Sequence, residues 1–153
     1  MAATNTAEAE YALEITRDFD APPALVFKAW TSKEHVLRLW GPKGFTATSE
    51  KLDFREGGAY RHAIHGPDGK SYSMSGVYRE IVEPEKIVFT FAWDDGPETL
   101  ITVTIKPEGS GTKLTFRQEP FADAATRDSH EGGWGECLDR LVAEMARQQG
   151  VQA

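Results

Sequence analysis

The side chains that could carry acid–base chemistry are few, and two of them lie close together in the sequence. His62 and His65 are three residues apart on a predicted strand, which places them on opposite faces of that strand. They could ligate one metal ion together only if the strand is bulged, so we expect no metal site. Tyr60 is expected to point inward, and His62 shares its face. His62 could therefore hydrogen-bond a ligand or act as a base, and a solvated or structurally satisfied histidine is the alternative.

Arg17 is a further candidate, because it falls on the apolar side of its predicted strand. An unpaired charge would be costly to bury, so an inward Arg17 would pair with a carboxylate or with an anionic ligand. The alternative is a bulge at the strand end that turns this side chain to solvent. Together with His62, Tyr60 and Tyr78, Arg17 completes the set of acid or base groups that are candidates for catalysis. The sequence has no catalytic-triad order, phosphate-binding glycine loop or paired-carboxylate motif, and it predicts no cofactor.

Aromatic side chains offer a different kind of chemistry, the binding of an apolar or aromatic molecule. The candidates to contact such a ligand are Trp30, Trp40, Phe45, Tyr60, Tyr72, Tyr78, Trp93 and Trp134. Each of them could equally be ordinary core. His130 precedes Trp134 by four residues, so the two share a helix face if the helix includes both. A cavity mouth, a surface position and a capping role are the open alternatives for His130.

The elements that must position these groups are mostly strands. A half-buried strand is predicted over 11–20, and two short helices follow, the first entered through Pro22 and Pro23 and the second capped by Ser32. Six further strands are separated only by short turn signals, which predicts an antiparallel sheet of about seven strands. These six strands are predicted over 45–54, 58–66, 71–82, 86–93, 98–106 and 112–119.

A single long helix follows the strands. Its apolar positions recur at helical spacing, and they are Trp134, Cys137, Leu138, Leu141, Val142 and Met145. Asp123 or the pair Asp128 and Ser129 could cap this helix. Gly132, Gly133 and Gly135 would each cost about 1 kcal/mol inside it. Either the helix backbone approaches the sheet or a ligand closely at these glycines, or the helix begins only near Trp134.

The sheet and the last helix together predict a pocket. Phe89, Phe91 and Trp93 share one side of their strand, and Ile101 and Val103 repeat the pattern on the next strand. These large side chains need a partner, and the last helix is the available one. A curved sheet closed by one helix tends to leave a cavity. We expect its walls to be Trp134 and Leu138 on the helix and Phe89, Phe91, Trp93 and Val103 on the sheet.

Composition bounds the class of protein. The 153 residues are 40% hydrophobic and 27% charged, which fits one globular domain. We expect that domain over 11–148, between a flexible leader over 1–10 and a flexible tail over 149–153. The 24 acidic and 17 basic residues give a net charge of -7, so nucleic acid and anionic membranes are not expected partners.

The cysteine content and the N-terminal sequence indicate in which cellular compartment the protein is expected. Cys137 is the only cysteine, which excludes an intrachain disulfide, and its place on the apolar stripe predicts a buried structural thiol. The N-terminus has no basic segment followed by an apolar one, and no apolar run reaches the length of a membrane span. We therefore expect a cytoplasmic protein without membrane insertion.

Several motifs resemble those of one known family. They are ITRDFDAP at 15–22, VFKAWT at 26–31, LWGP at 39–42, EGGAYR at 56–61, GVYREI at 76–81 and HEGGW at 130–134. In this order, over roughly residues 11 to 147, the chain resembles the homologues of the activator of heat-shock-protein-90 ATPase. That family belongs to the START-like (SRPBCC, Bet v 1-like) superfamily. The resemblance implies an α+β helix-grip fold, in which a seven-stranded curved antiparallel sheet, two short helices after the first strand and one long C-terminal helix enclose a cavity.

The resemblance also implies a range of functions. Members of the superfamily bind lipids, hormones, polyketides and other hydrophobic molecules, so a non-enzymatic binding protein for a small hydrophobic or aromatic molecule is the leading hypothesis. A polyketide cyclase or aromatase using His62 and Tyr60 is an alternative from the enzyme class. A protein-interaction module, as a homodimer or as a chaperone partner, is a third. The chaperone role is less expected, because the eukaryotic activators carry an additional N-terminal domain for which this chain has no room.

Overall fold

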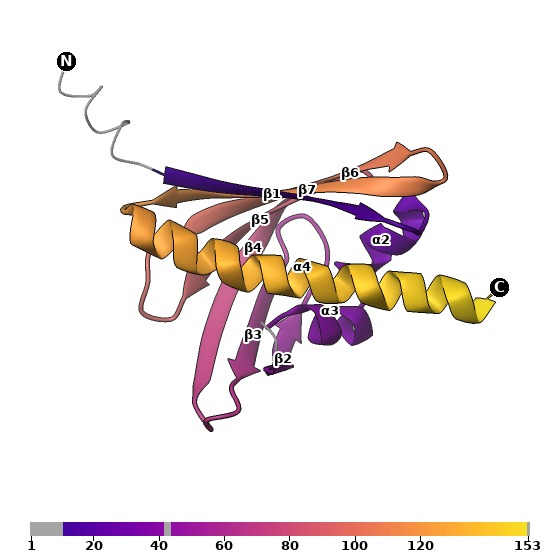
Figure 1. Cartoon of the computed structure of the whole chain (residues 1–153). Helices are drawn as coiled ribbons and strands as arrows, with labels where there is room; N and C mark the ends of the chain where they lie inside the picture. The colour runs from indigo at the N-terminus through magenta and orange to yellow at the C-terminus, as the bar shows by residue number, and fades with distance from the viewer. Residues whose placement is uncertain (1–10, 42–43, 153) are drawn as a thin grey trace, which may run out of the picture.

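The sheet is built from strands that follow one another through short turns. In the computed structural model, which describes residues 11–41 and 44–152, the chain forms seven strands and three helices (Figure 1). The strands are β1 (Tyr11–Phe19), β2 (Thr46–Leu52), β3 (Ala59–His65), β4 (Ser71–Val82), β5 (Lys86–Trp93), β6 (Thr99–Glu108) and β7 (Gly111–Phe121). The helices are α2 (Pro23–Ala29), α3 (Lys33–Leu39) and α4 (Ala124–Gln152). The leader predicted over 1–10 lies outside the described residues.

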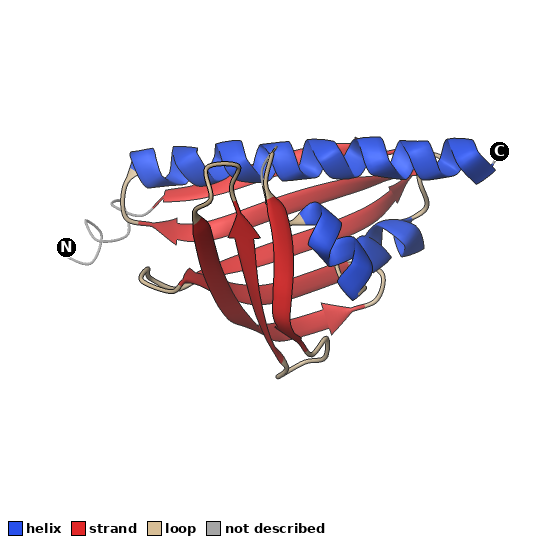
Figure 2. Ribbon diagram, turned by 90° about the horizontal axis from the view of Figure 1, so that it is seen from below, coloured by secondary structure: helices blue, strands red, loops and turns tan. Residues whose placement is uncertain are grey.

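All neighbouring strands pair antiparallel in the order β1-β7-β6-β5-β4-β3-β2. The first strand therefore pairs with the last one, with Leu13 opposite Gln118 and Phe19 opposite Thr112. The sheet bends so that β4, β3 and β2 turn away from β1, β7 and β6, and α4 lies on the side toward which they turn (Figure 1). Figure 2 shows α2 and α3 beside α4, over the same face of the sheet. The predicted α+β helix-grip architecture is confirmed.

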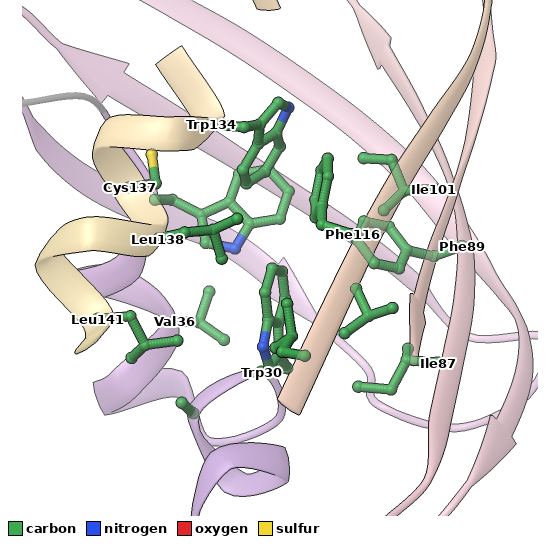
Figure 3. Close-up of a cluster of buried hydrophobic side chains, with 14 of the residues drawn as sticks. Trp30, Val36, Ile87, Phe89, Ile101, Phe116, Trp134, Cys137, Leu138 and Leu141 are labelled. Atoms are coloured by element: carbon green, nitrogen blue, oxygen red, sulfur yellow. The ribbon is translucent and has the colours of Figure 1, made fainter. Parts of the chain in front are cut away.

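Aromatic side chains fill the middle of the space between α4 and the sheet. Trp134 on α4 lies with its ring centroid 4.6 Å from that of Phe116 on β7. Trp30, at the end of α2, stacks on both rings, at 6.1 Å from Phe116 and 6.4 Å from Trp134. Leu138 continues the helix face against this cluster and is completely buried (Figure 3). Burial of each such side chain contributes about 2 kcal/mol, so this cluster holds α4 on the sheet.

The sequence left two alternatives for α4, a helix that includes the three glycines and a helix that begins only near Trp134, and the structure shows the first. The helix begins at Ala124, and the Asp123 carboxylate accepts a hydrogen bond from the backbone N–H of Thr126 at 2.7 Å. Asp123 is therefore the cap, and Asp128 is not. The expectation that the helix begins only near Trp134 is wrong, because a capped first turn and the buried Trp134 and Leu138 outweigh the helix cost of the glycines.

Close packing against the sheet does not explain those glycines either. A Cβ atom added at Gly132 or Gly133 would meet no atom within 4 Å. At Gly135 it would meet only an Arg17 guanidinium nitrogen, at 3.6 Å, which is an ordinary contact distance. The backbone of α4 is therefore not drawn against the sheet at these positions, and Gly133 has open space beside it.

The last helix extends almost to the end of the sequence. It continues to Gln152, so it includes residues 149–152 of the segment expected to form the C-terminal tail. Gly150 is a residue type that often ends helices, and here the helix passes through it. Among the described residues, no helix combines the length and the apolar character that a bilayer span requires.

The cap gives a direct test of where α4 begins. Asp123→Ala should lower the free energy of unfolding by about 1 kcal/mol, because the Thr126 N–H loses its side-chain acceptor. Urea denaturation monitored by circular dichroism measures this loss. Asp128→Ala is the matched control, because Asp128 makes only an exposed ion pair with Arg127, and it should change stability by less than about 0.5 kcal/mol. A larger loss for the control than for Asp123→Ala would contradict the assignment.

Candidate functional site

A pocket of about 330 Å³ lies between the N-terminal half of α4 and the bent part of the sheet. This volume exceeds that of an engineered cavity able to hold benzene and falls at the small end of ligand-binding pockets. Four elements contribute to its wall, together with the chain between α3 and β2. The lining residues are Trp40, Gly41, Phe45, Ile64, Tyr72, Met74, Phe91, Trp93, Ser129, His130, Gly133, Trp134 and Cys137.

The pocket exists because α4 presents small side chains at this end of the groove. Gly133 lines the pocket and has open space where a side chain would be, and the neighbouring lining residue one turn earlier is Ser129. Further along the helix, Leu138 and Leu141 are buried against the core (Figure 3). The void therefore lies beside Gly133 and Ser129, and the larger side chains His130 and Trp134 of the same helix also form part of its wall.

Trp40 forms the inner wall of the pocket. Its backbone N–H ends α3 by donating to the carbonyl of Val36, and Gly41 then turns the chain with a φ of 103°, which favours glycine. The Trp40 ring stacks near Phe91, at 6.0 Å and 23°, and meets the Trp134 ring edge-on at 5.2 Å. These contacts hold three aromatic faces around one space that an apolar ring could enter.

The mouth of the pocket carries its main polar contact. The indole N–H of Trp93 donates to Nε2 of His130 at 3.2 Å. Because Nε2 accepts this bond, the proton of the neutral imidazole lies on Nδ1. Burial lowers the pKa of His130, which favours the neutral form. Of the alternatives considered for His130, the structure shows a position in the pocket lining, on the helix face that it shares with Trp134.

His62 lies directly behind this wall. Its side chain is buried, with 1% exposure, and neither ring nitrogen has a hydrogen-bond partner. The ring contacts Trp40 and Tyr60, each at 5.0 Å between centroids. Burial lowers the pKa of His62 to about 4, and an interaction with the Arg61 backbone offsets only part of this effect. His62 is therefore a neutral imidazole at neutral pH, and the Arg61 backbone does not meet either ring nitrogen with hydrogen-bond geometry.

The other three candidate acid–base groups do not meet at the pocket. The Tyr60 hydroxyl donates to the carbonyl oxygen of Thr90 at 2.7 Å, and burial raises the pKa of both Tyr60 and Tyr78. Arg17 lies at the edge of the sheet, where its Nε donates to a carboxylate oxygen of Asp139 at 2.8 Å. The carboxylate partner expected for Arg17 is thus supplied by α4. None of the four candidates, His62 included, belongs to the lining.

Six of the residues predicted to contact a ligand line the pocket, and the others lie in the packed core. The six are Trp40, Phe45, Tyr72, Phe91, Trp93 and Trp134. The residues outside the lining are Trp30, Tyr60, His62, Tyr78, Phe89, Val103 and Leu138, all of them buried. They face the interior, but their neighbourhood is filled by aromatic packing such as that of Trp30 on Phe116 and of Trp40 on Phe89. The side of a strand or helix on which a residue lies therefore distinguishes buried from exposed residues. It does not distinguish a core residue from a residue that lines the pocket.

Sequence reasoning missed several lining residues. Ile64 lies on the same side of its strand as Tyr60 and His62, so the alternation of side chains along the strand could have identified it as an inward residue. Met74 faces His62 across the β3–β4 pair, and only the register shows this. Cys137 is buried as expected, and burial raises the pKa of its thiol to about 12, which keeps it protonated. Residues 11–41 and 44–152 contain no group of three His, Cys, Asp or Glu side chains able to hold a metal ion.

A second hollow, of about 180 Å³, lies between α3 and α4. Its lining is mostly charged and includes Arg38, Arg140 and Glu144. Arg38 donates to Glu144 at 3.3 Å, so the hollow is bordered by an ion pair that links the two helices. It lacks the aromatic faces of the larger pocket.

Comparison with known proteins places the chain in a family. Residues 20–146 match the family described as "Activator of Hsp90 ATPase homolog 1-like protein". A crystal structure of a protein from Chromobacterium violaceum is similar at 29% identity, over 88% of this chain and 96% of that one, with a TM-score of 0.83. The AHSA1 protein from Silicibacter pomeroyi is similar at 28% identity, over 90% and 99% of the two chains, with a TM-score of 0.80. A search of curated proteins found no match.

The buried imidazole makes stability depend on pH. In the unfolded chain His62 takes up a proton near pH 6.5, and in the folded protein only near pH 4. Between these values the unfolded state binds more protons, so stability is full above pH 6.5 and falls as the pH is lowered toward 4. From pH 7 to pH 5 this effect should cost about 2 kcal/mol, measured by urea denaturation at both values.

Two substitutions separate this effect from general acid sensitivity. His62→Leu should make the loss between pH 7 and pH 5 smaller by about 2 kcal/mol, without lowering stability at pH 7, because it removes an unpaired polar group. His65→Leu, three residues away on the opposite face of β3, should keep the full loss. If His62→Leu loses as much stability between pH 7 and pH 5 as the parent protein does, the imidazole is not buried in the neutral form.

Proposed function

Since the chain belongs to the family of activator of Hsp90 ATPase homolog 1-like proteins, we propose that it is a non-enzymatic binding protein for a small aromatic molecule. The ligand lies in the pocket beneath the N-terminal half of α4. The observation that supports this role is the pocket itself, an apolar space of about 330 Å³ beside a core that is otherwise filled by aromatic packing.

The pocket walls are suited to a flat ring. A guest ring placed against Phe91, Trp134 and Trp40 would remove apolar surface from water on both of its faces. Burial of about 200 Å² of apolar surface contributes about 5 kcal/mol, which corresponds to a Kd on the order of 100 µM for a small bicyclic hydrocarbon such as naphthalene. A cognate ligand with further polar contacts would bind more tightly.

The polar groups near the pocket favour binding over catalysis. The His130 Nε2 atom is engaged by Trp93, and the Tyr60 hydroxyl is engaged by the Thr90 carbonyl. Acid–base catalysis needs a group that can reach the reacting proton, and no two of Arg17, Tyr60, His62 and Tyr78 face the pocket together. The lining also contains no Asp, Glu, Lys or Arg, so the preferred guest is uncharged.

Gly133 allows the pocket to be filled without disturbing the fold. Gly133→Leu should weaken naphthalene binding at least tenfold, because the new side chain enters the void and meets nothing at its Cβ position. Titration followed through the tryptophan indole N–H signals in ¹H–¹⁵N NMR spectra measures the affinity. The same substitution should raise stability by about 0.8 kcal/mol, since leucine is the better helix residue.

Gly132→Leu is the matched control for this experiment. Gly132 is the adjacent helix glycine, it is exposed, and it does not line the pocket. The control should gain the same helix stability and keep the affinity of the parent for naphthalene. Equal affinities for both variants, or no binding by the parent protein, would contradict the proposed pocket.

A further inference from the structure

His62 is a buried polar group whose ring nitrogens make no hydrogen bond of good geometry within the protein. Both of its ring nitrogens are unsatisfied, although the side chain is only 1% exposed. Buried polar groups in folded proteins are nearly always hydrogen-bonded, and an unsatisfied one costs free energy. A leucine or methionine would fill the same space at no such cost. The imidazole therefore needs an explanation outside the packing of the fold.

The position of His62 connects it with the pocket. On β3 it is followed at the next inward position by Ile64, which lines the pocket. Across the strand pair it faces Met74, another lining residue. The Trp40 ring, which lines the pocket, contacts the His62 ring, with 5.0 Å between the two centroids. Displacement of the Trp40 side chain would join the imidazole to the pocket.

The side chains around His62 do not hydrogen-bond its ring nitrogens, so these nitrogens remain available to a ligand. The Tyr60 ring contacts the His62 ring, and the Tyr60 hydroxyl already donates to the Thr90 carbonyl at 2.7 Å. Met74 and Trp40 face it with a thioether and an aromatic edge. A neutral imidazole offers one acceptor nitrogen and one N–H donor, which a hydroxyl group complements in either role.

We propose that His62 is the polar anchor of the ligand site, and that the cognate ligand is an uncharged aromatic molecule bearing a hydroxyl group, of the phenol or naphthol class. This inference rests on the proposed function, and it adds the chemical class of the ligand. The ring lies in the pocket against Phe91 and Trp134, and the hydroxyl reaches a ring nitrogen of His62 past a displaced Trp40.

The pair 2-naphthol and naphthalene tests the anchor, because the two probes share a ring system and differ by one hydroxyl. Hydrophobicity alone favours naphthalene, so a preference for 2-naphthol reports a hydrogen bond in the site. We expect the parent protein to bind 2-naphthol about tenfold more tightly than naphthalene. In His62→Leu this preference should disappear. His62→Gln, which keeps an acceptor and a donor, should retain part of it.

A second measurement needs no variant. Long-range ¹H–¹⁵N NMR spectra of the parent protein should show the His62 ring nitrogens shifting with 2-naphthol and not with naphthalene. If naphthalene binds but the preference is the same in the parent and in His62→Leu, or if the His62 nitrogens do not respond to 2-naphthol, the anchor is wrong and the binding function stands. If neither probe binds the parent protein, both proposals are wrong.

Discussion

The packing of Trp30, Phe116 and Trp134 between the helices and the sheet is the interaction on which the rest of this structure depends. The three rings lie within 6.4 Å of one another and join α2, β7 and α4. They set the height of α4 above the sheet, because a helix supported on indole and phenyl rings cannot approach the strands more closely. Where α4 carries further large side chains, such as Leu138 and Leu141, the space under it is filled (Figure 3). Where it carries Gly133 and Ser129, the same separation leaves a void.

Much of this fold follows from local chemistry. The strand and turn pattern predicts seven antiparallel strands, and the structure has them with ends that differ by only a few residues. The beginning of α4 could not be decided in the same way, because Asp123 and Asp128 are equally good caps by residue type. Only the geometry of the first turn, in which Asp123 accepts the Thr126 N–H, distinguishes them. Gly132 and Gly133 are unfavourable in isolation, and tertiary packing of the same helix overrides that local preference.

The site was less predictable than the fold, for a physical reason. Strand parity assigns Phe89 and Phe91 to the same inward face, yet only Phe91 lines the pocket, because Phe89 is packed among Tyr60 and Tyr78. The shape of a void depends on which neighbouring side chain occupies each space, and this is a property of the whole assembly and not of one strand. The lack of a hydrogen-bond partner for His62 likewise depends on the surrounding side chains and not on its own strand. Parity indicates that it points inward, but its lack of a partner depends on Tyr60 bonding to Thr90 instead.

The central claim is that an aromatic guest enters the space between Trp40, Phe91 and Trp134. A crystal structure of the protein soaked with 2-bromonaphthalene tests this claim most directly, because anomalous scattering locates the bromine atom without reference to any variant. The account predicts a bromine peak inside this pocket, with the naphthalene ring against Phe91 and Trp134. Bromine found only on the surface or in the charged hollow between α3 and α4, with side chains filling the pocket, would contradict it.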